Sequence, residues 1–558
     1  MKIFIKIIFV HFSLLSLNLY AQDTSISADT SKIMSAELSE IVIKASKDNV
    51  TFRNIPASVS IVNEAAIYDN QINSLNDASG MIPNFYMPDY GSKLTSPVYI
   101  RGIGSRINSP SVGLYVDHVP YFEKATFDFD FFDIKRIEIL RGPQGTLFGR
   151  NTMGGIINIV TTSPLDYTGS KIALSAGTYG NYSVNATRYF RTNNNLFGSL
   201  AVNYLHNDGF YKNVYDNTNV DKLNSLGLRN RMIYEIAPGL TIENISFFEV
   251  SRQGGYPYAI YNDLLDQAEE INYNQKSGYD RDLFSDAMLI SLSKSSYDIT
   301  ATTAYQYLGD FQCIDQDFTP DSLYFIIQKQ KQHMLSQEII VRSKQKNERY
   351  KWLFGGYGFY QAFDNIVDVN AYASALNYLK TYNHKISGLA LFHQSTVNDF
   401  LFRNFTITAG LRLDTEKDFL HYNYIKIIND INNNPLADTV YPPLKSLEII
   451  PRLAFNYKIN NSSIYTVIAR GYKTGGFNST FERPEDLTFN PEYSWNYEIG
   501  FKTPVFGNLL YVDAALYYIN WKDQQIYQTV PSGRGSMLKN AGHSVSKGGE
   551  ASLLISLN

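Results

Sequence analysis

The segment IKRIEILRGPQGTLFGRNTMGGIINIVT, residues 134–161, decides how the rest of the chain is interpreted. Two short apolar strands are expected within it, at residues 137–140 and 156–160. The part between them holds five glycines: Gly142, Gly145, Gly149, Gly154 and Gly155. Glycine permits positive φ angles and close packing of one backbone on another, so we expect a compact, tightly turned piece of sheet. The segment offers no nucleophile beside a base and no cluster of metal ligands.

The composition favours a membrane β-barrel over an ordinary soluble protein. The 558 residues include 42 Tyr and 34 Phe, while only 18% are charged. Aromatic side chains gather at the two interfaces of a bilayer, which explains such a composition. A tyrosine-rich soluble β-protein, such as an adhesin, is the alternative that composition leaves open. The length implies at least two domains, and the net charge of -4 gives no basic surface for nucleic acid.

The N-terminus has the pattern of a secretory signal peptide. Lys2 and Lys6 precede an apolar run at residues 7–19, and cleavage is expected after Ala21. A membrane anchor is the alternative, but the run is short and polar residues interrupt it. Cys313 is the single cysteine, which excludes an internal disulfide framework in this exported chain. These features predict a signal peptide at residues 1–21 and an outer-membrane location in a Gram-negative cell.

Residues 38–46, LSEIVIKAS, form a short extended segment that has no evident strand partner nearby in the sequence. The leader before it, residues 23–37, consists of small and polar residues, and residues 47–53 after it are also polar. A β-prone peptide that is isolated in this way is suited to pairing with the sheet edge of another protein. The alternative is that it forms the first strand of the following domain.

The pattern of apolar, polar and turn-forming residues changes near residue 164. Residues 54–164 combine short apolar strands with turns and one expected helix at about residues 74–81, which predicts a small α+β domain. Residues 165–558 contain strand-length segments in which apolar and polar residues alternate, as in FTITAGLRLD at residues 405–414. Apolar residues outside and polar residues inside would make a transmembrane barrel. A soluble sandwich has the same period with the opposite sense, and periodicity cannot distinguish the two.

Several motifs in residues 54–164 resemble the plug domain of TonB-dependent outer-membrane receptors, which import iron siderophores and similar scarce ligands. The motifs are NIPASVSIV, DASGMIPNF, PVYIRGIGSR and VGLYVDHVPY, together with the segment at residues 134–161. Residues 468–478, 490–503 and 540–553 are similar to the barrel of that family. The resemblance implies a mainly β fold, a monomer, and a 22-stranded transmembrane antiparallel β-barrel whose lumen holds the N-terminal plug.

The resemblance also implies a partner protein in the periplasm. It identifies the extended segment at residues 38–46 as a TonB box, which pairs as a strand with the periplasmic domain of TonB. The residues assigned to this contact are Leu38, Ser39, Glu40, Ile41, Val42 and Ile43.

Four charged residues match the family's lock between plug and barrel: Arg101, Arg141, Glu498 and Glu550. A charge inside a filled barrel must be paired, because burying it alone costs several kcal/mol. Both glutamates lie on the lumen-facing parity of their strands. Gly102 beside Arg101 joins the five glycines quoted above as a plug glycine. The alternative is that each carboxylate is solvated or pairs with a neighbour such as Lys502.

The ligand would be met by outer loops and by the upper turns of the plug. Candidate residues are Tyr86, Tyr90 and Arg106, because aromatic faces and a cation can hold an anionic ferric chelate. The alternative is that they only pack on the barrel wall. A ferric siderophore is the expected ligand, with cobalamin or another chelate as the second choice. The sequence indicates no catalysis and no resident cofactor, and no histidine has ligand-like spacing.

The end of the chain departs from the family pattern. The family's barrel continues by about five strands beyond its second lock glutamate, whereas this chain ends at Asn558, shortly after Glu550. From Tyr167 onward there is room for about 17 strands. We therefore expect a barrel that lacks its last strands, through an incomplete sequence, a truncated gene or an unusual barrel size. An open sheet would leave edge groups unpaired in lipid.

Overall fold

The computed structural model describes residues 42–47, 50–106, 109–344, 349–372, 376–428, 431–432, 435–506, 510–533 and 535–555. They lie in one compact unit, Ser39–Leu557. The expected signal peptide, the leader and four of the expected TonB-box residues lie outside the described residues; those four are Leu38, Ser39, Glu40 and Ile41.

The plug is built on a five-stranded sheet with the order β1-β7-β8-β5-β6. Its strands are β1 (Val59–Asn63), β5 (Val112–Val116), β6 (Val119–Tyr121), β7 (Ile134–Arg141) and β8 (Gly155–Thr161). Within this sheet β5 and β8 are parallel, and the other neighbours are antiparallel. The two strands expected in the opening segment are therefore β7 and β8, which pair directly across its glycine-rich part.

Short helices and a small sheet complete the plug. They are η2 (Lys44–Ser46), α2 (Glu64–Asp69), η3 (Asp77–Met81), β2 (Phe85–Tyr86), β3 (Tyr99–Ile100), β4 (Ile103–Gly104), η4 (Lys124–Thr126) and α3 (Gly145–Phe148). The expected helix at residues 74–81 is only the 3-10 turn η3. The sequence analysis missed α2, whose first turn is capped by the Asn63 side chain accepting from the Ala66 N–H at 2.8 Å.

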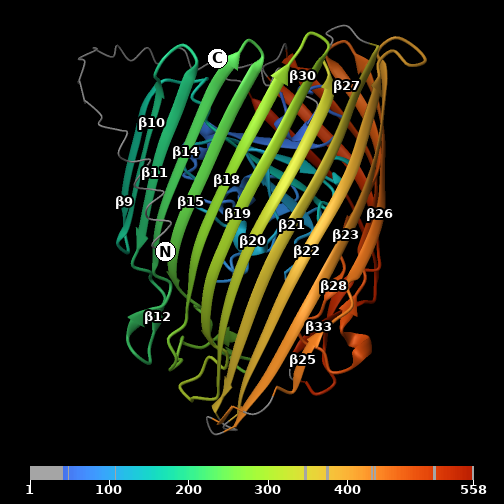
Figure 1. The fold of residues 1–558 in the computed structure, drawn as a ribbon. Coiled ribbons are helices and arrows are strands. Elements are labelled where there is room, and N and C mark those ends of the chain that lie inside the picture. The colour runs from blue at the N-terminus through green and yellow to red at the C-terminus, as the bar shows by residue number, and fades with distance from the viewer. Residues whose placement is uncertain are drawn as a thin grey trace, which may run out of the picture. The chain divides into compact units, whose positions relative to one another are not determined.

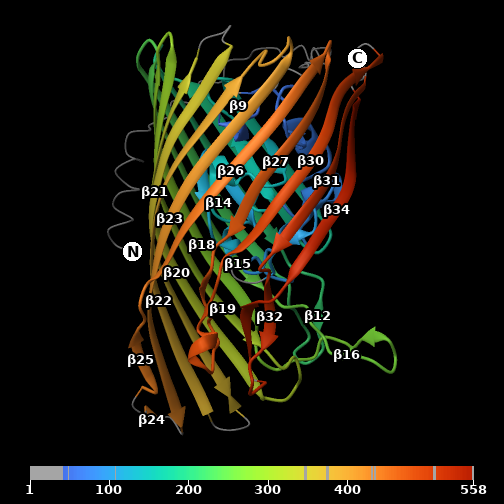
Figure 2. The ribbon, with the colours of Figure 1, turned by 90° about the vertical axis from the view of Figure 1, so that its right-hand side faces the viewer.

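A large antiparallel sheet follows the plug, as the fold-class prediction required. Its long strands in the described residues are β9 (Gly169–Gly177), β10 (Asn181–Arg191), β11 (Leu196–Asn207), β14 (Leu223–Ala237), β15 (Leu240–Gly254), β18 (Gly278–Ser293), β19 (Tyr297–Asp315), β20 (Tyr324–Ser343), β21 (Tyr350–Ala371), β22 (Leu376–Val397), β23 (Phe405–Ile428), β26 (Leu444–Ile459), β27 (Ser462–Lys473), β30 (Glu492–Val505), β31 (Leu510–Lys522) and β34 (His543–Ile555). The strands run side by side and strongly tilted (Figure 1). The plug, coloured blue to teal, lies behind the front strands in both views (Figure 2).

The two ends of the barrel differ in the length of their connections. One end has tight turns, such as residues 238–239 and 460–461. The other end carries long loops with their own short elements: β12 (Lys212–Asn213), β13 (Thr218–Asn219), β16 (Tyr261–Asn262), β17 (Gln267–Ala268), β24 (Ile431–Asn432), β25 (Ala437–Val440), β28 (Gly476–Phe477), η6 (Pro484–Asp486), β29 (Thr488–Phe489), β32 (Gln525–Thr529) and β33 (Ser536–Asn540). In Figure 1 the labelled elements β12, β25, β28 and β33 all lie at the lower end.

In the barrel strands the apolar side chains are exposed and the polar side chains between them are buried, as in a membrane β-barrel. In β23 the apolar Leu411 and Leu413 are 46% and 43% exposed, while the polar Arg412 and Asp414 between them are 3% and 7% exposed. The polar face therefore points into the lumen and the apolar face points outward. This sense distinguishes a transmembrane barrel from a soluble sandwich, which would bury its apolar residues.

The sheet closes as a barrel in which β34 lies next to β9. The described residues form sixteen long strands, close to the expected number of about 17 and fewer than the family's twenty-two. The closure differs from the expectation of an unclosed sheet, because the curved sheet brings its first and last strands together. A paired register joins all other neighbouring long strands from β9 to β34.

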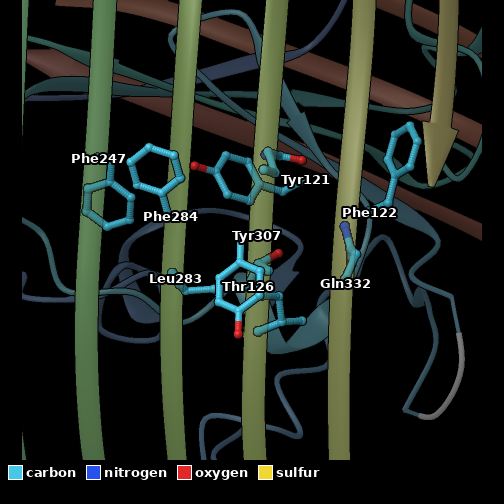
Figure 3. A pocket seen from close by; sticks show the side chains of 10 residues that line it. Tyr121, Phe122, Thr126, Phe247, Leu283, Phe284, Tyr307 and Gln332 are labelled. Carbon is cyan, nitrogen blue, oxygen red and sulfur yellow. The ribbon is translucent and has the colours of Figure 1, made fainter. Parts of the chain in front are cut away.

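The plug core continues into the barrel wall. Buried plug residues such as Phe129 and Phe132 pack on Phe247 of β15, with ring centroids 5.7 and 6.1 Å apart. Tyr121, Phe122 and Thr126 of the plug face the strands β15, β18, β19 and β20 (Figure 3). The space left between them is about 10 Å³, which is room for about one water molecule.

Candidate functional site

The structure brings the four residues of the expected plug–barrel lock together. Arg101 Nη1 donates to Glu498 Oε2 at 2.6 Å, and Arg101 Nη2 donates to Glu550 Oε1, also at 2.6 Å. Arg141 Nε donates to the same Glu550 oxygen at 2.9 Å. All four side chains are at most 2% exposed. The alternative partner Lys502 lies instead 3.6 Å from Asp513.

Neighbouring polar groups complete this cluster and were not found from the sequence. Glu498 Oε1 accepts from the Tyr465 hydroxyl at 2.9 Å and from the Ser58 N–H at 3.2 Å. Glu550 Oε2 accepts from Asn84 Nδ2 at 2.7 Å. Arg141 Nη2 also donates to the Ser58 hydroxyl at 2.6 Å. Each charged group therefore has several partners, which is the condition under which buried ion pairs are tolerated.

The electrostatics of the cluster hold Arg101 in its charged form. Burial by itself would lower the pKa of Arg101, but the charges of Glu498 and Glu550 outweigh it and raise the pKa. The Arg101 guanidinium also lies over the Tyr517 ring at 4.3 Å. Gly142, with φ of +82°, leaves room for the Arg101 guanidinium, because a Cβ at position 142 would lie 3.1 Å from Arg101 Nη1.

The described end of the expected TonB box is bound into the plug. Val42 forms an isolated antiparallel bridge with Thr51, and Ile43 is fully buried. The following turn η2 rests on the buried carboxylate of Glu138, which accepts from the Lys44 and Ala45 N–H groups at 3.1 and 2.8 Å. The sequence analysis assigned Glu138 no role.

Replacing Glu138 by glutamine is expected to release the turn η2 from the plug. The Lys44 and Ala45 N–H groups bond to different oxygens of Glu138, so the glutamine NH₂ group would face one of these donors and the other would lose its charged acceptor. Losing a charged hydrogen bond costs about 2 kcal/mol. A spin label at Lys44→Cys, in a Cys313→Ser background, should become markedly more mobile. The matched control is Glu123→Gln, because Glu123 bonds instead to Gln361 of the wall at 2.9 Å. Equal label mobility in the two variants would contradict the assignment.

Lys47 connects the segment after the turn to the barrel wall. Its ammonium lies 2.5 Å from Glu338 of β20 and 4.4 Å from the centre of the Phe148 ring. Arg342, also on β20, donates to the Lys47 carbonyl at 2.9 Å. Both wall residues lie near the β20–β21 connection, so this segment lies at the barrel end that carries the tight turns.

A second buried ionic cluster joins the plug to the opposite wall. Lys93 Nζ lies 2.7 Å from Asp130, whose N–H donates to Glu249 of β15 at 2.9 Å. Arg281 of β18 pairs with Glu249 and donates to the Asp128 carbonyl at 2.7 Å. In the sequence, only the alternating pattern of the two strands indicates this cluster, because it places Glu249 and Arg281 on the lumen-facing side.

The three expected ligand residues lie near the outer surface of the plug. The Arg106 guanidinium lies over the Tyr90 ring at 4.8 Å, which is a cation–π contact. Tyr86 is 60% exposed and lies beside Tyr99, with ring centroids 6.3 Å apart. The structure thus brings Arg106 and Tyr90 into contact, whereas Tyr86 belongs to the neighbouring aromatic pair.

Barrel loops add tyrosines to this site, and the sequence analysis missed them. The Tyr258 hydroxyl, from the β15–β18 loop, donates to the Tyr90 carbonyl at 2.7 Å. Burial raises the pKa of Tyr258, and the nearby Arg106 charge lowers it in part. Burial likewise raises the pKa of Tyr527 in β32, and the charge of Arg106 lowers this pKa in part. Arg106 therefore lies among aromatic groups from the plug and from two long loops.

Within the described ranges, no group of three or more His, Cys, Asp or Glu side chains is placed to hold a metal ion. No helix in the same ranges is both long and apolar enough to cross a membrane.

Comparison with known protein families agrees with this architecture. Residues 51–156 match the TonB-dependent receptor plug domain, and residues 123–558 match the TonB dependent receptor-like β-barrel. A plug and a barrel of these types define an outer-membrane transporter of a Gram-negative bacterium. The chain belongs to the TonB-dependent receptor family, whose members are transporters and not enzymes. The resemblance noted from the motifs is confirmed.

Two relatives that match most of this chain are pesticin receptors. The pesticin receptor of Yersinia enterocolitica serotype O:8 is 25% identical over 548 residues, which cover 94% of this chain and 76% of that protein. The pesticin receptor of Yersinia pestis is 25% identical, with 92% and 74% covered.

Solved structures show the same fold. The ferric yersiniabactin uptake receptor FyuA from Yersinia pestis superposes with a TM-score of 0.77 at 21% identity, covering 89% of this chain and 76% of that one. The siderophore receptor PiuA from Acinetobacter baumannii gives a TM-score of 0.75 at 16% identity, covering 94% and 80%.

Proposed function

We propose that this receptor imports an anionic ferric siderophore. The observation that carries the proposal is the Arg106 guanidinium stacked on Tyr90, among tyrosines from the plug and from two long loops. A cation surrounded by aromatic faces is suited to a ferric chelate with negative charge and flat iron-binding groups.

The position of this cluster fits capture from outside the cell. Bacterial outer-membrane barrels have short periplasmic turns and longer extracellular loops. The Arg106 cluster includes residues of the long loops, whereas Lys47 lies at the end with the tight turns. The ligand site and the TonB-proximal segment thus lie at opposite ends of the plug.

The relatives favour a siderophore over cobalamin. Two of the similar structures, FyuA and PiuA, are described as a ferric yersiniabactin receptor and a siderophore receptor. Vitamin B12 transporter BtuB of Vibrio vulnificus matches only 30% of this chain, at 28% identity. Cobalamin or another metal chelate is therefore the second candidate.

The TonB box and the plug–barrel lock would have different roles in this transport. Residues 38–43 would pair with the periplasmic domain of TonB, which supplies the energy for uptake. The Arg101–Arg141–Glu498–Glu550 cluster would hold the plug in the barrel between transport events. Bidentate arginine–carboxylate contacts are directional and can be hydrated when the plug moves, whereas an apolar contact would resist movement.

Uptake of iron by cells that express only this receptor tests the proposal. Cells lacking their own siderophore receptors would be given a panel of ⁵⁵Fe-labelled siderophores with different net charges, and labelled cobalamin in parallel. Accumulation of at least one anionic ferric siderophore, dependent on TonB, is expected. TonB-dependent accumulation of cobalamin alone would favour the second candidate.

Replacing Arg106 by glutamine is expected to weaken ligand binding by about tenfold or more. A cation–π and charge contribution of about 1–2 kcal/mol corresponds to a factor of this size. The measurement is equilibrium binding of the imported siderophore to purified receptor. The matched control is Arg483→Gln, since Arg483 is another exposed loop arginine, 3.7 Å from Glu485. Unchanged affinity in Arg106→Gln would remove Arg106 from the ligand site.

A further inference from the structure

The plug does not fill the barrel evenly. At the wall formed by β15, β18, β19 and β20, the pocket between plug and barrel has a volume of about 10 Å³, and Figure 3 shows the side chains that line it. On the wall formed by β20 to β23 and β26, a cavity of about 340 Å³ lies between plug and barrel. Its plug side is formed by residues 45–46, 50–51 and 54–56, together with parts of the opening segment. This cavity lies at the end with the tight turns, because Lys351 and Lys458 flank those turns.

The charged groups that line this cavity all have the same sign. They are Arg342, Lys351, Arg452 and Lys458, and the described lining includes no carboxylate. Arg452 donates to the Pro56 carbonyl at 2.9 Å, which keeps its charge on the cavity side of the plug. Uncharged polar groups such as Thr396, Thr408 and Asn456 make up much of the remaining wall.

The carboxylates near this cavity are held outside its lining. Asp298 lies 3.7 Å from Arg342 and 3.4 Å from Lys344. Asp399 accepts from the Asn404 N–H at 2.5 Å within its own turn. Because Arg342 is paired with Asp298, the positive potential of the recess comes mainly from Lys351, Arg452 and Lys458. In a recess with low-dielectric walls this potential raises the local concentration of anions and lowers that of cations.

We infer that this cavity is an anion-binding vestibule, through which an anionic ferric chelate leaves the receptor on its way to the periplasm. The inference rests on the proposed function for the charge of the cargo, and adds the path and the groups that hold the cargo. The cations replace the favourable contacts that an anion loses when it leaves the Arg106 cluster.

The vestibule is also positioned to respond to force on the N-terminal segment. Ala45 and Ser46 form part of its plug side, and only Lys44 separates them from Val42 and Ile43 of the proposed TonB box. The Lys47–Glu338 ion pair and the bond from Arg342 to the Lys47 carbonyl anchor this side to β20. Pulling Val42 and Ile43 away from the plug would therefore widen the vestibule before the sheet of the plug has to move.

Charge-selective modification of a cysteine in the cavity tests the inference without knowledge of the ligand. Thr396→Cys, in a Cys313→Ser background, places one thiol on the cavity wall of the full-length receptor. The probes are an anionic and a cationic methanethiosulfonate of similar size. Asn461→Cys, in the exposed turn at the same end of the barrel, gives the reference ratio of the two rates.

The anionic reagent is expected to react at Thr396→Cys at least about tenfold faster than the cationic one, relative to the reference thiol. Replacing Lys351, Arg452 and Lys458 together by glutamine should reduce this preference to within about threefold. Lys458→Glu alone should reverse much of it, which covers the case that the triple variant fails to fold. The matched control is Lys445→Gln on the same strand β26, because Lys445 does not line the cavity. A ratio of anionic to cationic rates near 1 in the otherwise wild-type cavity, relative to the reference thiol, would overturn the inference. A tenfold ratio that persists after these substitutions would also overturn it.

Uptake separates failure of this inference from failure of the proposed function. In the triple glutamine variant, TonB-dependent uptake of the anionic siderophore should fall several-fold while its binding affinity is unchanged. Full uptake in a variant that has lost its charge preference would overturn the vestibule's part in transport. Import of an uncharged ligand only, with the thiol preference intact, would contradict the proposed function and leave the anion site standing.

Discussion

Replacing Arg101 by alanine is expected to loosen the plug, to lower the thermal stability of the receptor and to make cells more sensitive to vancomycin. Arg101 is the one side chain in the described cluster that contacts both Glu498 and Glu550, so its removal leaves Glu498 buried without a cation hydrogen-bonded to it. Breaking a buried ion pair from one side costs about 3–5 kcal/mol. Insertion of the barrel should be retained, because the cluster lies inside the lumen. The readouts are thermal unfolding of the purified receptor and the sensitivity of cells to vancomycin, which an intact outer membrane excludes.

A compensating substitution separates the charge effect from a general packing defect. In Arg101→Ala/Glu498→Gln the uncompensated carboxylate is removed, so a large part of the lost thermal stability should return. Arg141→Ala should give a weaker effect of the same kind. Of the two glutamates, Arg141 contacts only Glu550, and its other partners include the neutral Ser58 hydroxyl. Wild-type stability and wild-type vancomycin resistance in Arg101→Ala would show that the cluster does not hold the plug.

Replacing Ile41 by proline is expected to reduce uptake to the level of cells without TonB. Strand addition to a partner sheet depends on main-chain hydrogen bonds, and proline removes one N–H donor and fixes φ. Binding of the siderophore to purified receptor should be unchanged, because the ligand site lies at the other end of the plug. Uptake of ⁵⁵Fe-siderophore and equilibrium binding are the two measurements.

Ile41→Ala is the matched control for this experiment. Alanine keeps the N–H group and shortens only the side chain, so uptake should remain within a few-fold of the wild-type rate. Rapid uptake by Ile41→Pro would show that this segment does not pair with TonB as a strand, or that the channel is passive.

Particular residues show how far sequence reasoning reached. The motifs around Arg101 and Arg141 and the lumen-facing parity of Glu498 and Glu550 were enough to propose that these four residues meet. Their helpers Asn84, Ser58 and Tyr465 have no recognisable motif, and each acts through hydrogen bonds to residues that are not its neighbours in the chain. Arg101 and Glu550 themselves are 449 residues apart, so their contact depends on the register of the whole sheet.

The short elements of the plug were predicted less well. The helices α2 and α3 span six and four residues, which is too short for an apolar period to be visible. The expected helix at residues 74–81 became a 3-10 turn just before Pro83. In such short elements, local caps and tertiary contacts outweigh intrinsic propensity.

The sequence by itself determined the family, the order of plug and barrel, and the alternation of the strands, because these follow from motifs and from a period of two. Only the tertiary structure decided which face of each strand points outward, where Glu138 holds the N-terminal segment, and which wall carries the cationic cavity. These features arise where residues far apart in the chain are brought together by strand register and by the fit of the plug. No local pattern encodes that fit, and the opening segment at residues 134–161 gains its neighbours only inside the barrel.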